Sequence, residues 1–284
     1  MADSWKKLKE WPQVYLQRLE DAGVARIVWN RPEKRNSLTK EMMDGAFEAL
    51  EIIRADPELK VVITKGEGGV YSSGLNLNFL REQSHGYKRG QKDWDRPTPT
   101  IAFTEAIREF PRIMIAQVQG YCLGGAFGLM NNHDLIIAAE NAQIGMPEIP
   151  RGSFGQIATS TLFHSGIPLK KASLLALTAK NFTGKEADAV GLISMAVPEA
   201  ELESATLRIA REIASRHLAP LQHHKIAVQL GRDLPLGTAI RIDQLVGARQ
   251  SLYIDPVAHV EDYLKSQKGG PNFSTEGYKR PDVK

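Results

Sequence analysis

The sequence contains a single cysteine, Cys122, so it cannot form an internal disulfide bond. No apolar run reaches the roughly 18 residues that a membrane-spanning helix needs, and no basic and apolar leader opens the chain. Neither sign of charge dominates, since 36 Lys and Arg residues stand against 33 Asp and Glu residues. A dedicated nucleic-acid-binding protein usually carries a concentrated basic face. We therefore expect a cytoplasmic protein in a reducing compartment that binds neither nucleic acid nor membranes.

The remaining composition is that of an ordinary globular protein. Of its 284 residues, 42% are hydrophobic and 24% are charged. A chain of this length buries well over half of its surface and needs no disulfide or metal to fold. The histidines, including the adjacent pair His223 and His224, do not follow a metal-ligand spacing, so no metal site is expected.

Short buried strands alternate with amphipathic helices through the first two-thirds of the chain. We predict strands at residues 24–30, 60–65, 113–119 and 134–139 and helices at 39–54, 100–110 and 124–131. Residues 81–99 are charged and contain prolines, which is typical of a surface loop. Beyond residue 200 the pattern becomes helical, at residues 201–216, 220–230 and 237–265, before a polar tail. The sequence thus predicts an α/β core over residues 1–200 and a helical region with a tail over residues 201–284.

Two of the predicted strands lead into turns of small residues, at 70–77 and 119–128. Glycine allows backbone N–H groups to approach a ligand closely. If a helix begins at Gly125, its first N–H groups are unpaired and lie at the positive end of the helix dipole, where they would stabilise a developing oxyanion. Either turn alone could equally be a tight turn under close packing. Neither is a phosphate loop, because no Gly-Lys-Ser/Thr follows.

Five segments, in order, resemble motifs of the crotonase (enoyl-CoA hydratase/isomerase) superfamily. They are NRPEKRNSL at 30–38, SSGLNL at 72–77, QGYCLGGA at 119–126, GMPEI at 145–149, and FTG through GLI at 182–193. The resemblance extends from about residue 14 to residue 263. It implies a spiral of ββα units with a helical C-terminal region, assembled as homotrimers or as hexamers of two trimers.

The resemblance also implies an acyl-CoA thioester substrate, with coenzyme A present as part of the substrate and no separate cofactor. The backbone N–H groups of Leu75 and Gly125 would form the oxyanion hole. Contacts to coenzyme A or the acyl group are expected from Lys34, Arg35, Ser37, Ser73, Asn76, Tyr121 and Gly128. Among these, the Ser73 carbonyl would accept from the adenine amino group. Lys34 and Arg35 would lie near phosphates, although a solvated turn would also explain these two cations.

The catalytic carboxylates depart from the superfamily pattern. Standard hydratases use two glutamates, and Gly128 stands at the position of the first, while the second is retained as Glu148. We predict that Glu148 is the general acid and base; a surface ion pair with Arg151 is its alternative role. Gln156 occupies the position at which dehalogenase-like members and dienoyl-CoA isomerases carry an acid, which disfavours both reactions.

These residues favour an enoyl-CoA hydratase or hydratase-lyase. Single-glutamate members of the superfamily include hydroxycinnamoyl-CoA hydratase-lyases, whose C-terminal tail residues 264–280 weakly resemble. They also include some enoyl-CoA isomerases, so a delta-isomerase using the same residues is the alternative. A non-catalytic crotonase-fold binding protein remains a hypothesis of a different class, because the first glutamate is missing.

Overall fold

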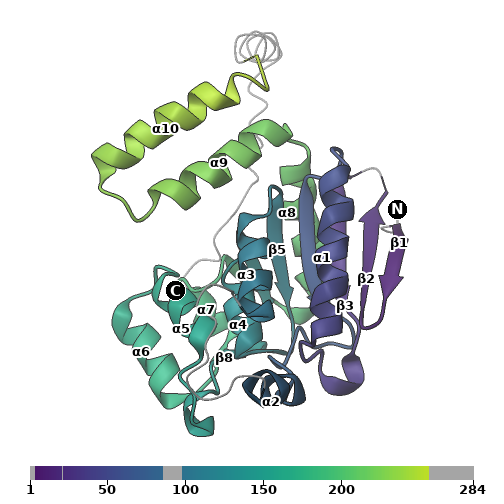
Figure 1. The fold of residues 1–284 in the computed structure, drawn as a ribbon, viewed down its shortest axis with the longest axis vertical. Coiled ribbons are helices and arrows are strands. Elements are labelled where there is room, and N and C mark those ends of the chain that lie inside the picture. Colours follow the sequence, from purple (N-terminus) through teal and green to yellow (C-terminus); the bar gives the residue numbers. More distant parts are fainter. Residues whose placement is uncertain (1–3, 21, 86–97, 256–284) are drawn as a thin grey trace. The chain divides into compact units, whose positions relative to one another are not determined.

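The computed structural model describes residues 4–20, 22–85 and 98–255 (Figure 1). The chain divides into two compact units, Met1–Lys225 and Ile226–Lys284. Within the described ranges, no helix has the length and apolar character to cross a membrane. The first unit contains both sheets and every residue predicted for the site, so the account below concerns that unit.

A seven-stranded sheet forms the centre of the first unit, in the order β1-β2-β3-β4-β5-β7-β10. Its strands are β1 Trp5–Trp11, β2 Val14–Leu19, β3 Val24–Trp29, β4 Val61–Gly66, β5 Ile113–Val118, β7 Leu135–Ala139 and β10 Met195–Val197. The β1-β2-β3 pairs are antiparallel, and all pairs from β3 to β10 are parallel. All residues of β3 and β5 are buried, as expected for parallel strands covered on both faces. The predicted strands are confirmed, whereas the β1–β2 hairpin was not predicted.

A second, three-stranded sheet contains β6 Tyr121–Leu123, β8 Gln143–Gly145 and β9 Phe182–Thr183. The chain passes from β5 to β6 and then into helix α4, Gly125–Met130, and from β7 to β8 and then towards helix α5, Gln156–Phe163. Each passage is a strand of the large sheet, a strand of the small sheet and a helix. The predicted α/β class and the ββα repeat are therefore confirmed.

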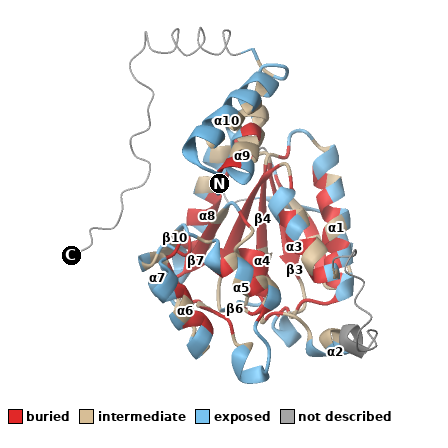
Figure 2. Ribbon diagram, turned by 60° about the vertical axis from the view of Figure 1, so that its left-hand side comes forward, coloured by how far each residue is buried: buried red, intermediate tan, exposed pale blue. Residues whose placement is uncertain are grey.

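Helices cover both faces of the large sheet (Figure 2). On one face, α1 Lys40–Ala55 and α3 Pro99–Glu109 pack against Trp29, whose ring lies 6.1 Å from that of Phe103. On the opposite face lies α8, Leu202–Ala214, whose Glu203 accepts hydrogen bonds from Arg26 and Lys65. Alternate residues of a strand point to opposite faces, so Arg26 and Trp29 project to different sides of β3. The other helices of the described ranges are α2 Leu77–His85, α6 Leu169–Thr178, α7 Gly184–Ala189, α9 Leu218–Gly231 and α10 Leu236–Gln250, with 3-10 turns η1 Pro32–Lys34, η2 Ile149–Arg151 and η3 Glu199–Glu201.

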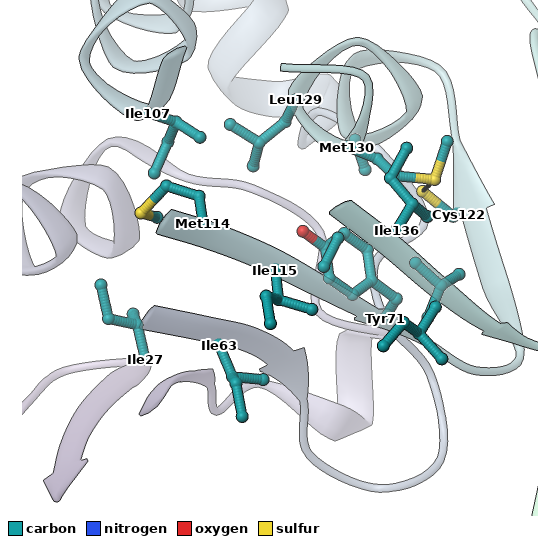
Figure 3. Close-up of a cluster of buried hydrophobic side chains, with 14 of the residues drawn as sticks. Ile27, Ile63, Tyr71, Ile107, Met114, Ile115, Cys122, Leu129, Met130 and Ile136 are labelled. Carbon is teal, nitrogen blue, oxygen red and sulfur yellow. Dashed lines mark hydrogen bonds between the residues drawn. The ribbon is translucent and has the colours of Figure 1, made fainter. Parts of the chain in front are cut away.

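The buried core reaches directly under the glycine turns (Figure 3). Tyr71, near the start of the first turn, is fully buried, and its hydroxyl lies 2.9 Å from Thr64 Oγ1. Cys122, in the second turn, is also fully buried, and burial raises the pKa of its thiol. Both side chains therefore pack in the core, and this packing holds the backbone of the two turns in place.

Two predicted segments need correction. The first part of the predicted loop 81–99 is helical, because α2 extends to His85; residues 86–97 lie outside the described residues. Asn76 caps this helix, since its Oδ1 accepts from the N–H groups of Asn78 and Phe79 at 3.0 and 3.1 Å. The predicted helix 237–265 is shorter, because α10 ends at Gln250 and turns follow; residues 256–265 again lie outside the described part.

Candidate active site

The two glycine turns lie in direct contact. Ser72 and Cys122 form an isolated parallel bridge, in which Ser72 N–H donates to the Tyr121 carbonyl at 2.8 Å. Gly74 has a φ of +97°, and a Cβ placed on it would lie 2.6 Å from the Leu123 carbonyl oxygen. Only glycine fits this position, because any other residue would be strained at this φ and its side chain would collide with the neighbouring turn.

Each turn presents a backbone N–H without a protein acceptor. In the described ranges, neither Leu75 N–H nor Gly125 N–H donates a hydrogen bond to protein. Leu75 is held by its bridge to Leu38, whose N–H and carbonyl bond Gly74 and Asn76 instead. Gly125 begins α4, so its N–H is one of the unpaired donors of a helix start. A Cβ on Gly125 would lie 2.7 Å from Leu75 Cγ, which shows how closely the two residues approach.

A carboxylate lies against this pair of turns. Glu148 precedes the 3-10 turn η2, and its Oε1 would lie 2.9 Å from a Cβ on Gly124. Its Oε2 is buried and has no hydrogen-bond partner among the described residues. The surface ion pair with Arg151 does not form. Glu148 therefore has an unpaired carboxylate oxygen beside the unpaired N–H donors.

Burial raises the pKa of Glu148 above its ordinary value of 4.5, while its own backbone N–H and the positive charge of Arg151 oppose the shift. A folded-state pKa above the unfolded one adds stability below the unfolded pKa, and this stability is lost as pH rises through the folded pKa. Glu148→Gln removes the titration. We expect the melting temperature of Glu148→Gln, relative to wild type, to increase as pH rises above 4.5. A pH-independent difference would contradict the raised pKa.

A pocket of about 220 Å³ opens beside Glu148. Its walls come from the segment around Met146 and Ile149, from Phe154 and Phe163 at either end of α5, and from Ser173 and Leu177 on α6. Glu148 is the only charged residue among those lining it. An apolar cavity with a few polar groups is the usual form of a small-molecule site.

Comparisons with known proteins identify the family of the chain. The enoyl-CoA hydratase/isomerase family model matches residues 20–250. The chain belongs to this family. It is 28% identical over 225 residues to a hydroxycinnamoyl-CoA hydratase-lyase of Pseudomonas fluorescens, covering 79% of this chain and 80% of the relative. It is 26% identical over 249 residues to an enoyl-CoA hydratase of Mycobacterium tuberculosis, covering 87% and 91%.

Solved structures of the enoyl-CoA hydratase/isomerase family share the fold. Human enoyl-coenzyme A hydratase domain-containing protein 3 superposes with a TM-score of 0.80 at 27% identity, covering 89% of this chain and 98% of the human one. An enoyl-CoA hydratase of Bacillus anthracis gives a TM-score of 0.78 at 23% identity, covering 90% and 96%. The crotonase-like fold expected from the five motifs is thereby confirmed.

Other residues predicted for the site form a second group beside the turns. Ser73 N–H donates to the Arg35 carbonyl at 2.9 Å, and Asn76 Nδ2 lies 3.5 Å from Ser37 Oγ. The Arg35 guanidinium lies 5.7 Å from the centre of the Tyr121 ring. Lys34 and Arg35 are exposed on the loop that carries η1. This loop is shaped by Asn36, which is fully buried and donates to the carbonyls of Glu67 and Val70.

Gly128 lies apart from these groups, buried against α5. A Cβ on Gly128 would lie 2.8 Å from Ile157 Cγ2 and 3.1 Å from the Ala158 backbone nitrogen. Helix α5 therefore occupies the space next to Gly128, the residue that the resemblance places at the position of the first glutamate of standard hydratases. The close contact with α5 is possible because residue 128 has no side chain, and it leaves no room for a carboxylate there.

The substitution Gly128→Glu should destabilise the fold. Forcing a side chain into a packed interior costs about 1–3 kcal/mol, and burying a carboxylate adds to this cost. We expect a lower free energy of unfolding in urea, a smaller loss for Gly128→Ala, and partial recovery when Ile157→Ala is combined with Gly128→Glu. Unchanged stability of Gly128→Glu would mean that α5 moves away freely.

The pocket walls on α5 and α6 were not predicted from the sequence. Residues 169–178 do carry a helical signal, because Ala172, Leu175 and Ala176 are spaced at i, i+3 and i+4 and are buried. What makes these walls unusual is exposure: Phe154, Phe163 and Leu177 are 66%, 42% and 70% exposed. Exposed apolar side chains around a cavity indicate a binding surface, but exposure is a property of the fold and not of the sequence.

Proposed function

We propose that the protein is an enoyl-CoA hydratase or hydratase-lyase that uses Glu148 as its general acid and base. The observation that carries the proposal is the unpaired, buried Oε2 of Glu148 beside the turns of Leu75 and Gly125. A buried carboxylate oxygen without a hydrogen bond lowers the stability of the fold. A family member that only bound another macromolecule would gain nothing from such a group.

The thioester oxygen would accept from Leu75 N–H and Gly125 N–H. Addition to an enoyl thioester places negative charge on that oxygen, and preorganised donors stabilise the charge more than water does. Both donors are available, because their N–H groups have no acceptor within the described part of the chain. The bridges to Leu38 and between Ser72 and Cys122 hold the backbone in place before substrate arrives.

Glu148 would handle every proton in the reaction. It accepts a proton from water as the oxygen bonds to the β-carbon, and it returns that proton to the α-carbon of the enolate. In a lyase step it would then take the proton of the β-hydroxyl while the bond between the α- and β-carbons breaks. That step releases an aldehyde and the enolate of acetyl-CoA, which is protonated in turn. The raised pKa of Glu148 brings proton donation closer to neutral pH.

Coenzyme A would lie along the exposed loop of Lys34 and Arg35. These cations suit its phosphates, and the Ser73 carbonyl accepts no hydrogen bond from the described residues, so it remains available to the adenine amino group.

The protein would act as a homotrimer or a hexamer of two trimers, a prediction that light scattering at micromolar concentration tests. A strict monomer would contradict it.

A panel of enoyl-CoA thioesters tests the proposed function. Each should be followed for loss of enoyl absorbance and, in parallel, for released aldehyde, and the panel should include a hydroxycinnamoyl thioester because one relative is named for it. Calorimetry with acetyl-CoA measures binding separately. Loss of absorbance without aldehyde indicates hydration alone, and both signals indicate a hydratase-lyase. A folded protein that neither binds acetyl-CoA at millimolar concentration nor turns over any thioester would overturn the proposal.

A further inference from the structure

The pocket beside Glu148 contains one hydroxyl group that the fold does not use. Besides Glu148, its polar lining residues are Thr159 and Ser173. Thr159 Oγ1 donates to the Phe154 carbonyl, so its hydrogen is already engaged. For Ser173 Oγ, the structure records no hydrogen-bond partner among the described residues. Among the residues that line this pocket, Ser173 thus has the one hydroxyl whose hydrogen is not engaged by the protein.

Neighbouring hydroxyl groups show that this is a local peculiarity. A serine or threonine inside a helix commonly donates to the carbonyl four residues earlier. In α5 and α6, Ser160 donates to Gln156, Thr161 to Ile157, and Thr178 to Leu174. Ser173 stands in the middle of α6 and makes no such bond to Leu169. Its hydroxyl is therefore left for a group inside the pocket.

The size and lining of the pocket limit what that group belongs to. The cavity measures about 220 Å³, and cavities of about 150 Å³ with aliphatic and phenylalanine walls bind benzene. Phe154 and Phe163 supply ring edges and faces, with which an aromatic ring packs well. Ala176, on the same face of α6 as Ser173, has a small side chain and so leaves room in the cavity at that point. The space suits one aromatic ring with a small substituent.

We infer that Ser173 determines acyl-group specificity, and that the preferred substrate carries an aromatic ring with a hydroxyl substituent that hydrogen-bonds Ser173 Oγ. The inference rests on the proposed function, because it takes the pocket beside Glu148 as the acyl site. A ring hydroxyl that exchanges its hydrogen bonds to water for one to Ser173 Oγ is bound favourably. An unsubstituted ring leaves Ser173 Oγ without a partner in an apolar pocket and is bound less well.

The test compares two arylpropenoyl-CoA thioesters, with and without a ring hydroxyl, on wild type and on Ser173→Ala. One neutral hydrogen bond corresponds to roughly 3- to 10-fold in kcat/KM. We expect wild type to prefer the hydroxylated thioester by that factor, mainly through KM, and Ser173→Ala to lose the preference. Ser160→Ala is the matched control, because Ser160 lies on the neighbouring helix, is exposed and does not line the pocket. Its preference should equal that of wild type.

Several outcomes would overturn the inference. These are the absence of a preference in wild type, an equal slowing of both thioesters by Ser173→Ala, and an effect of Ser160→Ala equal to that of Ser173→Ala. Ser173→Thr retains a hydroxyl, so restored preference in that variant supports the assignment if Ser173→Ala folds poorly. A third substrate, the short straight-chain 2-butenoyl-CoA, separates the two levels of the argument. If wild type turns it over while ignoring the ring hydroxyl, only the Ser173 inference fails; if wild type turns over no thioester, the proposed function fails.

Discussion

Glu148→Gln should leave coenzyme A binding intact and reduce turnover by a factor of about 10²–10⁴. Glutamine has the size of glutamate and keeps an oxygen beside Gly124, so the turns should retain their geometry. It cannot accept or return a proton at the same position. Because no second carboxylate lines the described pocket, the loss should lie at or above the upper part of that range. Steady-state rates on the best thioester of the panel, with calorimetry of acetyl-CoA, measure both quantities.

The matched control is Glu51→Gln on α1. Glu51 is exposed and pairs with Arg54 at 3.2 Å, and exposed ion pairs contribute little to stability. This variant should keep the wild-type rate. Glu148→Gln with full activity on the best substrate would refute the proposed mechanism, and a loss of binding equal to the loss of rate would assign Glu148 to binding alone.

Gly125→Val is expected to reduce kcat by a factor of about 10²–10³, the usual cost of removing one oxyanion donor. A Cβ at this position would lie 2.7 Å from Leu75 Cγ and 3.3 Å from both Leu75 Cδ atoms. Relieving these contacts displaces Gly125, Leu75 or both, and each supplies one of the proposed donors. The variant therefore disturbs at least one of the two N–H groups, and Gly125→Ala should show a smaller defect of the same kind.

Stability must be measured alongside activity, because glycine substitutions also act through the unfolded chain. Gly237→Val serves as the control, since a Cβ on Gly237 meets no described atom within 4 Å. It should retain its rate. A folded Gly125→Val protein with normal kcat would mean that the thioester oxygen is held elsewhere.

The sequence predicted the chemical centre better than its surroundings. The glycine turns could be located because glycine at positive φ, as at Gly74 and Gly124, leaves a direct trace in the sequence. The central strands β3, β4 and β5 could be located because buried parallel strands consist mainly of apolar residues. Both signals are local, so a single sequence contains them in full.

Contacts between distant residues could not be predicted in the same way. Gly128 shows the absence of a carboxylate, but nothing in the sequence places Ile157 against it. The α2 helix was missed because its cap, Asn76, was interpreted as part of a turn, and the charged residues beyond it favoured a loop. The β1–β2 hairpin was missed because an edge strand needs no apolar run: β1 is mostly exposed and rich in lysine.

The strand order also has a consequence for biosynthesis. From β1 to β10, each strand of the large sheet pairs with a strand made earlier, so the sheet can grow at one edge as the chain leaves the ribosome. Until residues 195–197 are made, β7 is the growing edge, and the apolar stretch Ile137–Ala139, which later pairs with β10, has no partner strand on that side. Such an edge can pair with another nascent chain. β10 is only three residues long, yet it covers this part of the edge, so the nascent sheet stays open to such pairing until β10 has been made.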